Sequence, residues 1–433
     1  MEGSARAGYR DGYRSLLEIL AHLHVPRADV ASGWAGSLAA PGRQYPRRQY
    51  LHLGCFFLVS AVYVNLLRER LEYGDLAAYL LGASNLYNGE PFDSLYIYPP
   101  FWAMLLKPLV PLGEETFLNV LWLLNLLSLM AFYFLLHRVL ERYGFTPRLA
   151  SLVVTLFMLA NVAIIRTMFY MQINLHVLNL IFLGLLLYPR SRLLSAFFLA
   201  LAVHLKASPL VLVLAFLLER DWRWLAWLGF FGFFIFAVTF LNDGVGPYAS
   251  YLQNLGLLNG PRGLILRDTS FDSFFWALAQ LARLPSALAR LGIYAAKGGL
   301  VLVSLLLVGR AVRGRSFYQG DSANLFNALP PLFILMNMTS PLVWEHHGVF
   351  LALPALLLLS VLDAPAAWGW FGVFYFFQYL LPTFDFFPWS YVRMLTPLLL
   401  LWLLWRASGP SRGETLLFRR VNQWLETLPG LPA

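Results

Sequence analysis

The chain has 433 residues, of which 59% are hydrophobic and 13% are charged, and its mean hydropathy is +0.62. Soluble globular proteins carry about 25% charged residues, so this composition excludes an ordinary soluble enzyme and indicates a polytopic membrane protein. The net charge of +9 does not indicate nucleic-acid binding, because Arg and Lys cluster between apolar runs, where they orient membrane helices. The single cysteine, Cys55, excludes an internal disulfide.

The N-terminal segment, 1–48, is basic and polar, and we expect no signal peptide in it. Leucines at helical spacing over 13–23 predict a helix lying on the inner membrane surface. The arginines of this segment place the N-terminus in the cytoplasm. The first span, 50–67, therefore carries the following loop to the outside.

Apolar runs continue along the chain and predict an all-α protein with 12 crossings and both ends inside. After 50–67 they cover 99–112, 117–136, 149–165, 175–187, 193–218, 222–241, 289–308, 325–338, 349–362, 366–381 and 389–405. A span needs about 17–25 residues, so several of these runs are short, tilted or broken. The charge rule and simple alternation conflict at one place. The link 138–148 is basic, which predicts the cytoplasmic side, but alternation puts it outside. Either 99–112 is re-entrant and 193–218 crosses twice, or the charge rule fails at this link.

The stretch 73–108 combines features that suit a reaction site at the bilayer surface. Asp75 follows the first span, an amphipathic helical pattern covers 76–87, and a turn at 88–91 leads to Tyr98-Pro99-Pro100. A carboxylate at the mouth of a membrane helix, then a flat helix and a rigid di-proline, is typical of such a site. The alternative is a hydrated loop in which Asp75 caps a helix.

Three further groups of residues are polar where the chain is otherwise apolar. Lys206 lies between two apolar halves, a costly place for a cation, so it is expected to face a cavity or an anion unless it extends to the interface. Arg166, Gln172 and Asn174 cluster at a span boundary, where ordinary interfacial polar residues also occur.

The densest titratable group is 344–347, Trp-Glu-His-His. One histidine is a plausible polar contact or proton acceptor, and two inert interfacial histidines are the alternative. Adjacent histidines point differently on a helix, and the sequence has no metal-ligand spacing, Walker loop or dinucleotide fingerprint, so we expect neither a metal nor a cofactor.

These elements together resemble glycosyltransferase family 87, which includes the polyprenol-phosphate-mannose-dependent mannosyltransferases of mycobacterial phosphoinositol-mannoside synthesis. Three elements of the chain resemble the first external loop of that family: Asp75 with the helix after it, Gly89-x-Pro91-Phe92, and Tyr98-Pro99-Pro100. Its later elements, Gly-Gln-x-Asn, Lys-Pro-x-Pro and Ser-Pro-x-x-Trp-x-His-His, resemble 171–174, 206–209 and 340–347. Met171 replaces the glycine and Ala207 replaces the first proline.

The resemblance implies a GT-C fold, a multi-pass protein of the cell (inner) membrane with its active site facing the periplasm or exterior. It implies a polyprenyl-phosphate hexose donor, with mannose expected, a lipid-linked or surface glycan acceptor, and contact with membrane lipids but not nucleic acid. The corresponding parts of the chain are a cytoplasmic segment 1–48, a membrane module 49–241 carrying the catalytic loop, an external loop 242–288 with a surface helix over 271–284, membrane helices 289–405 and a cytoplasmic tail 406–433.

Transfer from a lipid phosphate needs a base on the acceptor hydroxyl and a cation at the departing phosphate. Asp75 is the expected base with His347 as its rival, and Lys206 with Arg166 is expected to bind the phosphate. One carboxylate favours inverting single displacement. The other expected substrate-binding residues are Tyr98, Gln172, Asn174, Trp344, Glu345 and His346. The competing interpretations are a transporter or flippase of lipids or sugar-lipids, which also uses broken helices, and a structural scaffold.

Overall fold

The computed structural model describes residues 48–67, 75–84, 96–261, 265, 267–408 and 415–427. Within these ranges the chain is helical and contains no strand, which confirms the all-α prediction. The surface helix predicted over 13–23 and the turn predicted at 88–91 lie outside the described residues.

The helices up to the middle of the chain correspond closely to the predicted apolar runs. They are α2 (Arg48–Leu67), α3 (Leu76–Ala83), α4 (Pro100–Leu106) with its 3-10 extension η2 (Lys107–Leu112), α5 (Glu114–Arg142), α6 (Pro147–Leu159), α7 (Val162–Phe169), α8 (Asn174–Leu187), α9 (Arg192–Leu205), η3 (Ser208–Leu212), α10 (Val213–Leu218) and α11 (Trp222–Asp243). The helix predicted over 76–87 is shorter than expected, because α3 already ends at Ala83.

The rest of the chain adds two helices in the long connection and then a second group of packed helices. These are α12 (Gly246–Leu258), α13 (Phe271–Leu281), α14 (Ser286–Gly314), α15 (Ala323–Met338), η4 (Glu345–Leu351), α16 (Ala352–Val361), α17 (Pro365–Tyr375), the π-helical turn η5 (Phe376–Leu380), η6 (Trp389–Tyr391), α18 (Val392–Ala407) and α19 (Leu416–Thr427). The helix predicted over 271–284 is α13, whose first turn is capped by the Ser270 hydroxyl. The sequence analysis did not predict α12.

Three helices of the described chain, α5, α11 and α14, are long and apolar enough to cross a membrane. α6 and α7 pass the same test together, with a bend of 62° between them, which makes a fourth. α11 and α14 leave most of their apolar residues unburied by protein, as expected of helices that face lipid. Most of the other apolar helices are shorter than a full span, so the count of 12 crossings stays a prediction.

The predicted interruption of 193–218 is present. α9 ends at Leu205, Lys206 has an extended backbone, and Pro209 lies in the first turn of η3. Proline lacks the N–H that would continue the helix and is favoured at a helix start, so the chain restarts there. This break leaves Lys206 outside regular helix.

The basic link between α5 and α6 lies beside α19. Asn422 of α19 accepts hydrogen bonds from the backbone and side chain of Thr146 and donates to the carbonyl of Gly144. α19 lies within the tail 406–433 that we predicted to be cytoplasmic, and α4 with η2 is short. The contact therefore favours the arrangement in which 99–112 is re-entrant and 193–218 crosses twice.

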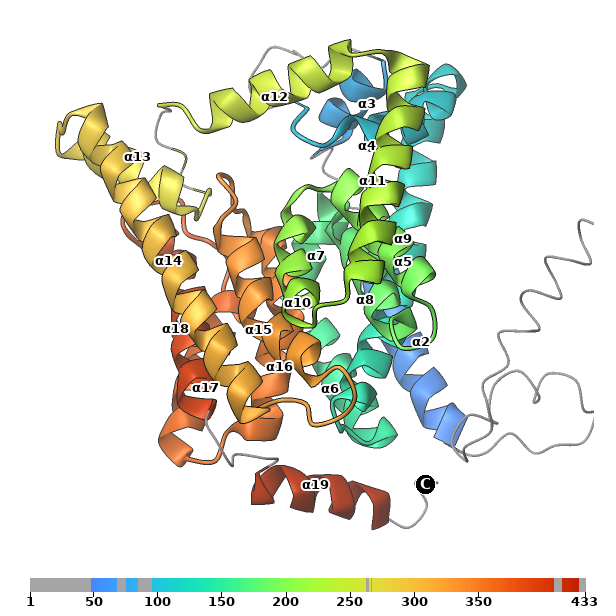
Figure 1. The fold of residues 1–433 in the computed structure, drawn as a ribbon, viewed down its shortest axis with the longest axis vertical. Helices are drawn as coiled ribbons and strands as arrows, with labels where there is room; N and C mark the ends of the chain where they lie inside the picture. Colours follow the sequence, from blue (N-terminus) through green and yellow to red (C-terminus); the bar gives the residue numbers. More distant parts are fainter. Residues whose placement is uncertain are drawn as a thin grey trace, which may run out of the picture. The chain divides into compact units, whose positions relative to one another are not determined.

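The packed helices of residues 51–433 have two distinct ends. α3, α4 and α12 lie together at the top of Figure 1, and α19 lies across the bottom. α3 packs against α4, and α4 also contacts α12. The end formed by α3, α4 and α12 carries the polar residues that the sequence singled out.

This arrangement predicts the labelling of single cysteines in a Cys55→Ser background. Cysteines at Ser84 and Asp385, both exposed, should react with an impermeant thiol reagent in intact cells, and one at Gln423 of α19 should not. Permeabilised cells, in which all three should react, are the control. Labelling at Gln423 in intact cells, or at only one of the other two positions, would contradict the shared outer face.

Candidate functional site

A cavity of about 670 Å³ lies at this end of the protein and collects residues from distant parts of the chain. Its lining includes seven of the ten predicted site residues: Asp75, Tyr98, Gln172, Lys206, Trp344, His346 and His347. The remaining three, Arg166, Asn174 and Glu345, are not part of the lining. Its lining also includes Tyr251, Leu255 and Leu258 of α12, which the sequence analysis missed.

Asp75 lies at the N-terminus of α3 but does not cap that helix through its side chain. Its Oδ2 instead accepts a hydrogen bond from the hydroxyl of Tyr98, which also lies 3.0 Å from Oε1 of Gln172. Burial raises the pKa of the Asp75 carboxyl, while hydrogen bonds from Tyr98 and Gln172 and the charge of Lys206 oppose the rise. A buried carboxylate with a raised pKa is a better proton acceptor than an ordinary exposed one.

Close packing holds Asp75 and Tyr98 together. A Cβ atom at Gly82 of α3 would lie 2.5 Å from the ring of Tyr96, so only glycine permits this approach. The carbonyl of Tyr96 accepts a hydrogen bond of 2.8 Å from Asn254 of α12. The ring of Tyr98 lies 5.4 Å from that of Tyr79 of α3. The segment 96–99, which precedes α4, is thereby fixed between α3 and α12.

Gly82→Ala tests this packing. Glycine to alanine inside a helix ordinarily stabilises, but here the added methyl group must displace the buried Tyr96 ring, at a cost of about 1–3 kcal/mol. We therefore expect a lower Tm for Gly82→Ala. Gly256→Ala in α12, where no atom lies within 4 Å of the added Cβ, is the matched control and should keep or raise the Tm. A lowered Tm in the control alone would contradict the tight contact.

Lys206 is the buried basic group of the cavity, and Arg267, also in the lining, is exposed and donates two hydrogen bonds of 3.0 Å to the carboxylate of Asp385. The Nζ of Lys206 donates to Oδ1 of Asn174 at 2.8 Å and lies 2.9 Å from Nε2 of His347 and 5.4 Å from the ring centre of Phe350. Burial lowers the pKa of Lys206 to about 7, and the nearby carboxylate of Asp75 opposes this shift. Asn174, predicted as a substrate contact, thus lies behind the lining and orients the lysine.

The geometry of His347 shows how the lysine is accommodated. The backbone N–H of Trp344 donates to Nδ1 of His347 at 3.0 Å, so Nδ1 carries no proton. A neutral imidazole then carries its proton on Nε2, which faces Lys206, and such a contact suits an unprotonated amine. As the rival base, His347 would have to give up one of these two contacts.

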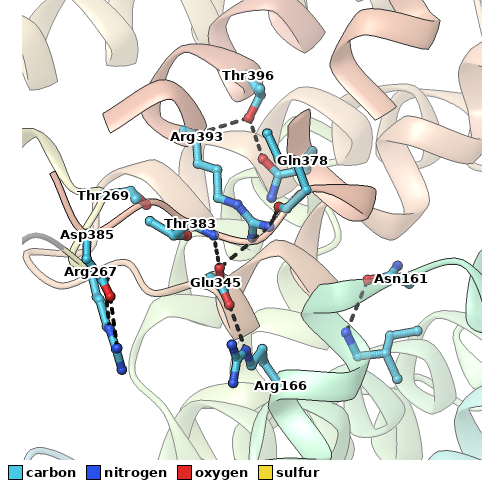
Figure 2. Close-up of polar contacts among 12 residues, drawn as sticks. Asn161, Arg166, Arg267, Thr269, Glu345, Gln378, Thr383, Asp385, Arg393 and Thr396 are labelled. Atoms are coloured by element: carbon cyan, nitrogen blue, oxygen red, sulfur yellow. Dashed lines mark hydrogen bonds and ion pairs between the residues drawn. The ribbon is translucent and has the colours of Figure 1, made fainter. Parts of the chain in front are cut away.

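Arg166 and Glu345 are paired with each other. Nε of Arg166 donates to Oε2 of Glu345 at 3.0 Å, as Figure 2 shows. Arg393 of α18 and the backbone N–H of Thr383 also contact Glu345. The sequence analysis missed Arg393, since an arginine inside an apolar run reads as an interfacial residue.

The cavity lining therefore combines polar and apolar residues. The polar residues include a proton acceptor, Asp75, and a basic group, Lys206, and α12 supplies apolar residues. Such a lining suits an anionic headgroup attached to an apolar chain, with room for a hydroxyl-bearing molecule beside it.

The lowered pKa of Lys206 predicts a pH dependence for anion binding. Above pH 7 the empty site holds a neutral amine, and an anion must recruit one proton to restore the ammonium. The affinity for a short isoprenyl phosphate should then fall by about tenfold per pH unit between pH 7.5 and 9.5. Isothermal titration calorimetry in buffers of different ionisation enthalpy should show uptake of one proton.

Two variants complete this experiment. Lys206→Met should bind the isoprenyl phosphate more weakly, and its affinity should no longer depend on pH. Lys297→Met removes a lysine of α14 that pairs with Asp272 of α13, and its affinity should keep the pH dependence. Lys206→Met should also raise the Tm of the empty protein near pH 7. A folded-state pKa below the ordinary value means that burial of Lys206 costs stability, and this cost shrinks as the pH rises from 7 towards 10. A pH-independent affinity in the unmodified protein would contradict the neutral lysine.

Comparison with protein families gives a match over part of the chain. The model of glycosyltransferase family 87 matches residues 96–270, and this match supports membership of the chain in that family. The matched stretch contains Tyr98, Gln172 and Lys206, whereas Asp75 and 344–347 lie outside it. No curated protein matches the chain.

Proposed function

We propose that this member of glycosyltransferase family 87 transfers a hexose, with mannose expected, from a polyprenyl phosphate to a lipid-linked or surface glycan. Its family supports glycosyltransferase activity. The donor, the sugar, the acceptor and the reaction course are our proposals. So are a GT-C fold with 12 crossings and a site that opens to the periplasm or exterior of the cell membrane.

One observation carries this proposal: a carboxylate and an amine lie in one cavity whose lining also includes apolar residues of α12. Among the described residues of the lining, Asp75 is the one carboxylate and Lys206 the one lysine. A lipid phosphate has an anionic headgroup for Lys206 and an apolar chain for Leu255 and Leu258. A nucleotide-sugar donor would have no use for these apolar residues.

The proposed reaction is a single displacement at the anomeric carbon. The acceptor hydroxyl attacks this carbon from the side opposite the phosphate and gives its proton to the Asp75 carboxylate. The bond between the anomeric carbon and the phosphate oxygen breaks, and its electron pair stays on the phosphate. Lys206, protonated when the phosphate binds, stabilises the charge that develops there. Covalent catalysis would need a second carboxylate about 5 Å away.

Arg166 and Glu345 have a different place in this proposal from the one that the sequence suggested. Their ion pair lies outside the lining, so neither has to contact the donor. Lys206 is then the proposed phosphate partner, because the other cation of the lining, Arg267, pairs with Asp385. Tyr98, Gln172, Trp344 and His346 remain the residues that line the space for sugar and acceptor.

Asp75→Asn tests the assignment of the base. The amide keeps the size of the side chain and its contact with Tyr98 but removes the basicity, so transfer should slow by about 10²–10⁴-fold while donor binding is retained. Transfer is measured with purified protein in lipid, labelled polyprenyl-phosphate mannose and a membrane-lipid extract as acceptor. Asp321→Asn, which changes an exposed carboxylate between α14 and α15, is the matched control.

His347→Ala distinguishes the two candidate bases. Near-normal transfer by Asp75→Asn together with a collapse in His347→Ala would assign proton abstraction to the histidine. If the unmodified protein binds lipid phosphate and moves it across a bilayer without forming a new glycolipid, the transporter interpretation holds instead.

A further inference from the structure

Glu345 lies immediately before the two histidines of the site, and three groups converge on its carboxylate. Its side chain is 11% exposed. Oε2 accepts the hydrogen bond from Nε of Arg166 at 3.0 Å, and Oε1 accepts one from the backbone N–H of Thr383 and lies 3.7 Å from Nη2 of Arg393 (Figure 2). α7, the loop after η5 and α18 therefore meet at one side chain.

Arg393 is the most buried cation of this group. It lies in the first turn of α18, is 6% exposed, and donates from Nη2 to the carbonyl of Leu381. A buried guanidinium requires an anionic partner, and a buried carboxylate requires a cation. Arg166 is about one-third exposed and so is partly hydrated, which makes Arg393 the better-shielded partner of Glu345.

The next turn of η4 is held with equal tightness. A Cβ atom at Gly348 would lie 2.5 Å from Nε2 of Gln378 and 3.1 Å from Cβ of Ala163. Gln378 is itself fixed through its Oε1, which accepts the hydroxyl of Thr396 on α18 (Figure 2). α7 and η5 therefore pack tightly against η4, and α18 holds η5 in place through Thr396.

The two residues between these anchors are His346 and His347. The carbonyl of His346 accepts hydrogen bonds of 3.3 Å from Thr167 and from Asn174, the residue that also orients Lys206. The ring of His347 meets Lys206 at 2.9 Å. A shift of Glu345 would move this segment against Lys206, because only one residue, His346, separates Glu345 from His347.

We propose that Arg393 is a positioning residue of the cavity, which acts by holding Glu345 so that His347 faces Lys206. It is not among the residues that line the cavity, and it lies outside the stretch matched by the family model. The inference rests on the proposed function only for its effect on transfer. The geometric effect on His347 is independent of what the cavity binds.

The test compares Arg393→Gln with Arg148→Gln. Arg148 is also 6% exposed and also donates to a backbone carbonyl, that of Leu425 in α19, at the opposite end of the protein. Each purified protein is assayed for Tm, for transfer, and for the rate at which diethyl pyrocarbonate modifies His347, followed by peptide mass spectrometry. This reagent acylates an imidazole nitrogen that bears no proton, and both nitrogens of His347 are engaged in the unmodified protein.

Both variants should lose a similar amount of thermal stability, but only Arg393→Gln should expose His347 and raise its modification rate severalfold. Displacement of a contact by about 1 Å costs about 100-fold in rate, so kcat for transfer should fall by about 10- to 100-fold in Arg393→Gln with a smaller change in KM. Arg393→Lys keeps the charge without the planar fork and should recover part of both effects.

Glu345→Gln covers the case in which Arg393→Gln does not fold. It removes the charge that Arg393 holds while it keeps the side-chain shape, and it should expose His347 in the same way. Unchanged modification of His347 in both Arg393→Gln and Glu345→Gln would overturn the positioning role. So would an equal loss of kcat in Arg148→Gln. If the unmodified protein transfers no sugar, the proposed function fails, and the modification rates still decide the inference.

Discussion

The site depends on where one amine can be kept among apolar helices. Burial disfavours the charged form of Lys206, whose amine contacts Asn174 and His347 and has the carboxylate of Asp75 at longer range. The break at Pro209 makes this possible. Lys206 lies outside the helices there, so helical geometry does not set the direction of its side chain. The empty site consequently avoids a permanent buried charge and gains one only when an anion arrives.

The residues that are energetically unfavourable in apolar surroundings were the easiest to predict from the sequence. A lysine between apolar runs, a carboxylate after a first span and two histidines in a hydrophobic region all cost free energy unless they have a use. Pro209 predicted the interruption near Lys206, because proline lacks the N–H that would continue a helix. The helices over apolar runs followed from composition and length alone.

The roles of Asn174 and Glu345 depend on packing and lay beyond the sequence. Whether a polar side chain faces the cavity or the back of its neighbours is decided by contacts between helices far apart in the chain. Arg393 was missed for this reason: its partner lies in η4, and nothing local marks it. The residues of α12 were also missed, because this 13-residue helix is too short for a span and lies across the end of the bundle (Figure 1).

The ion pairs of Glu345 have a consequence for how the protein is made. Arg393 leaves the ribosome about fifty residues after Glu345, which at roughly 5–20 residues per second is an interval of several seconds. During it Glu345 can pair with Arg166, which was synthesised long before, but not with α18. If Arg393 positions Glu345 as proposed, the segment with His346 and His347 reaches its final position only after α18 has packed. A nascent chain therefore contains every residue of the cavity lining before these histidines are in place.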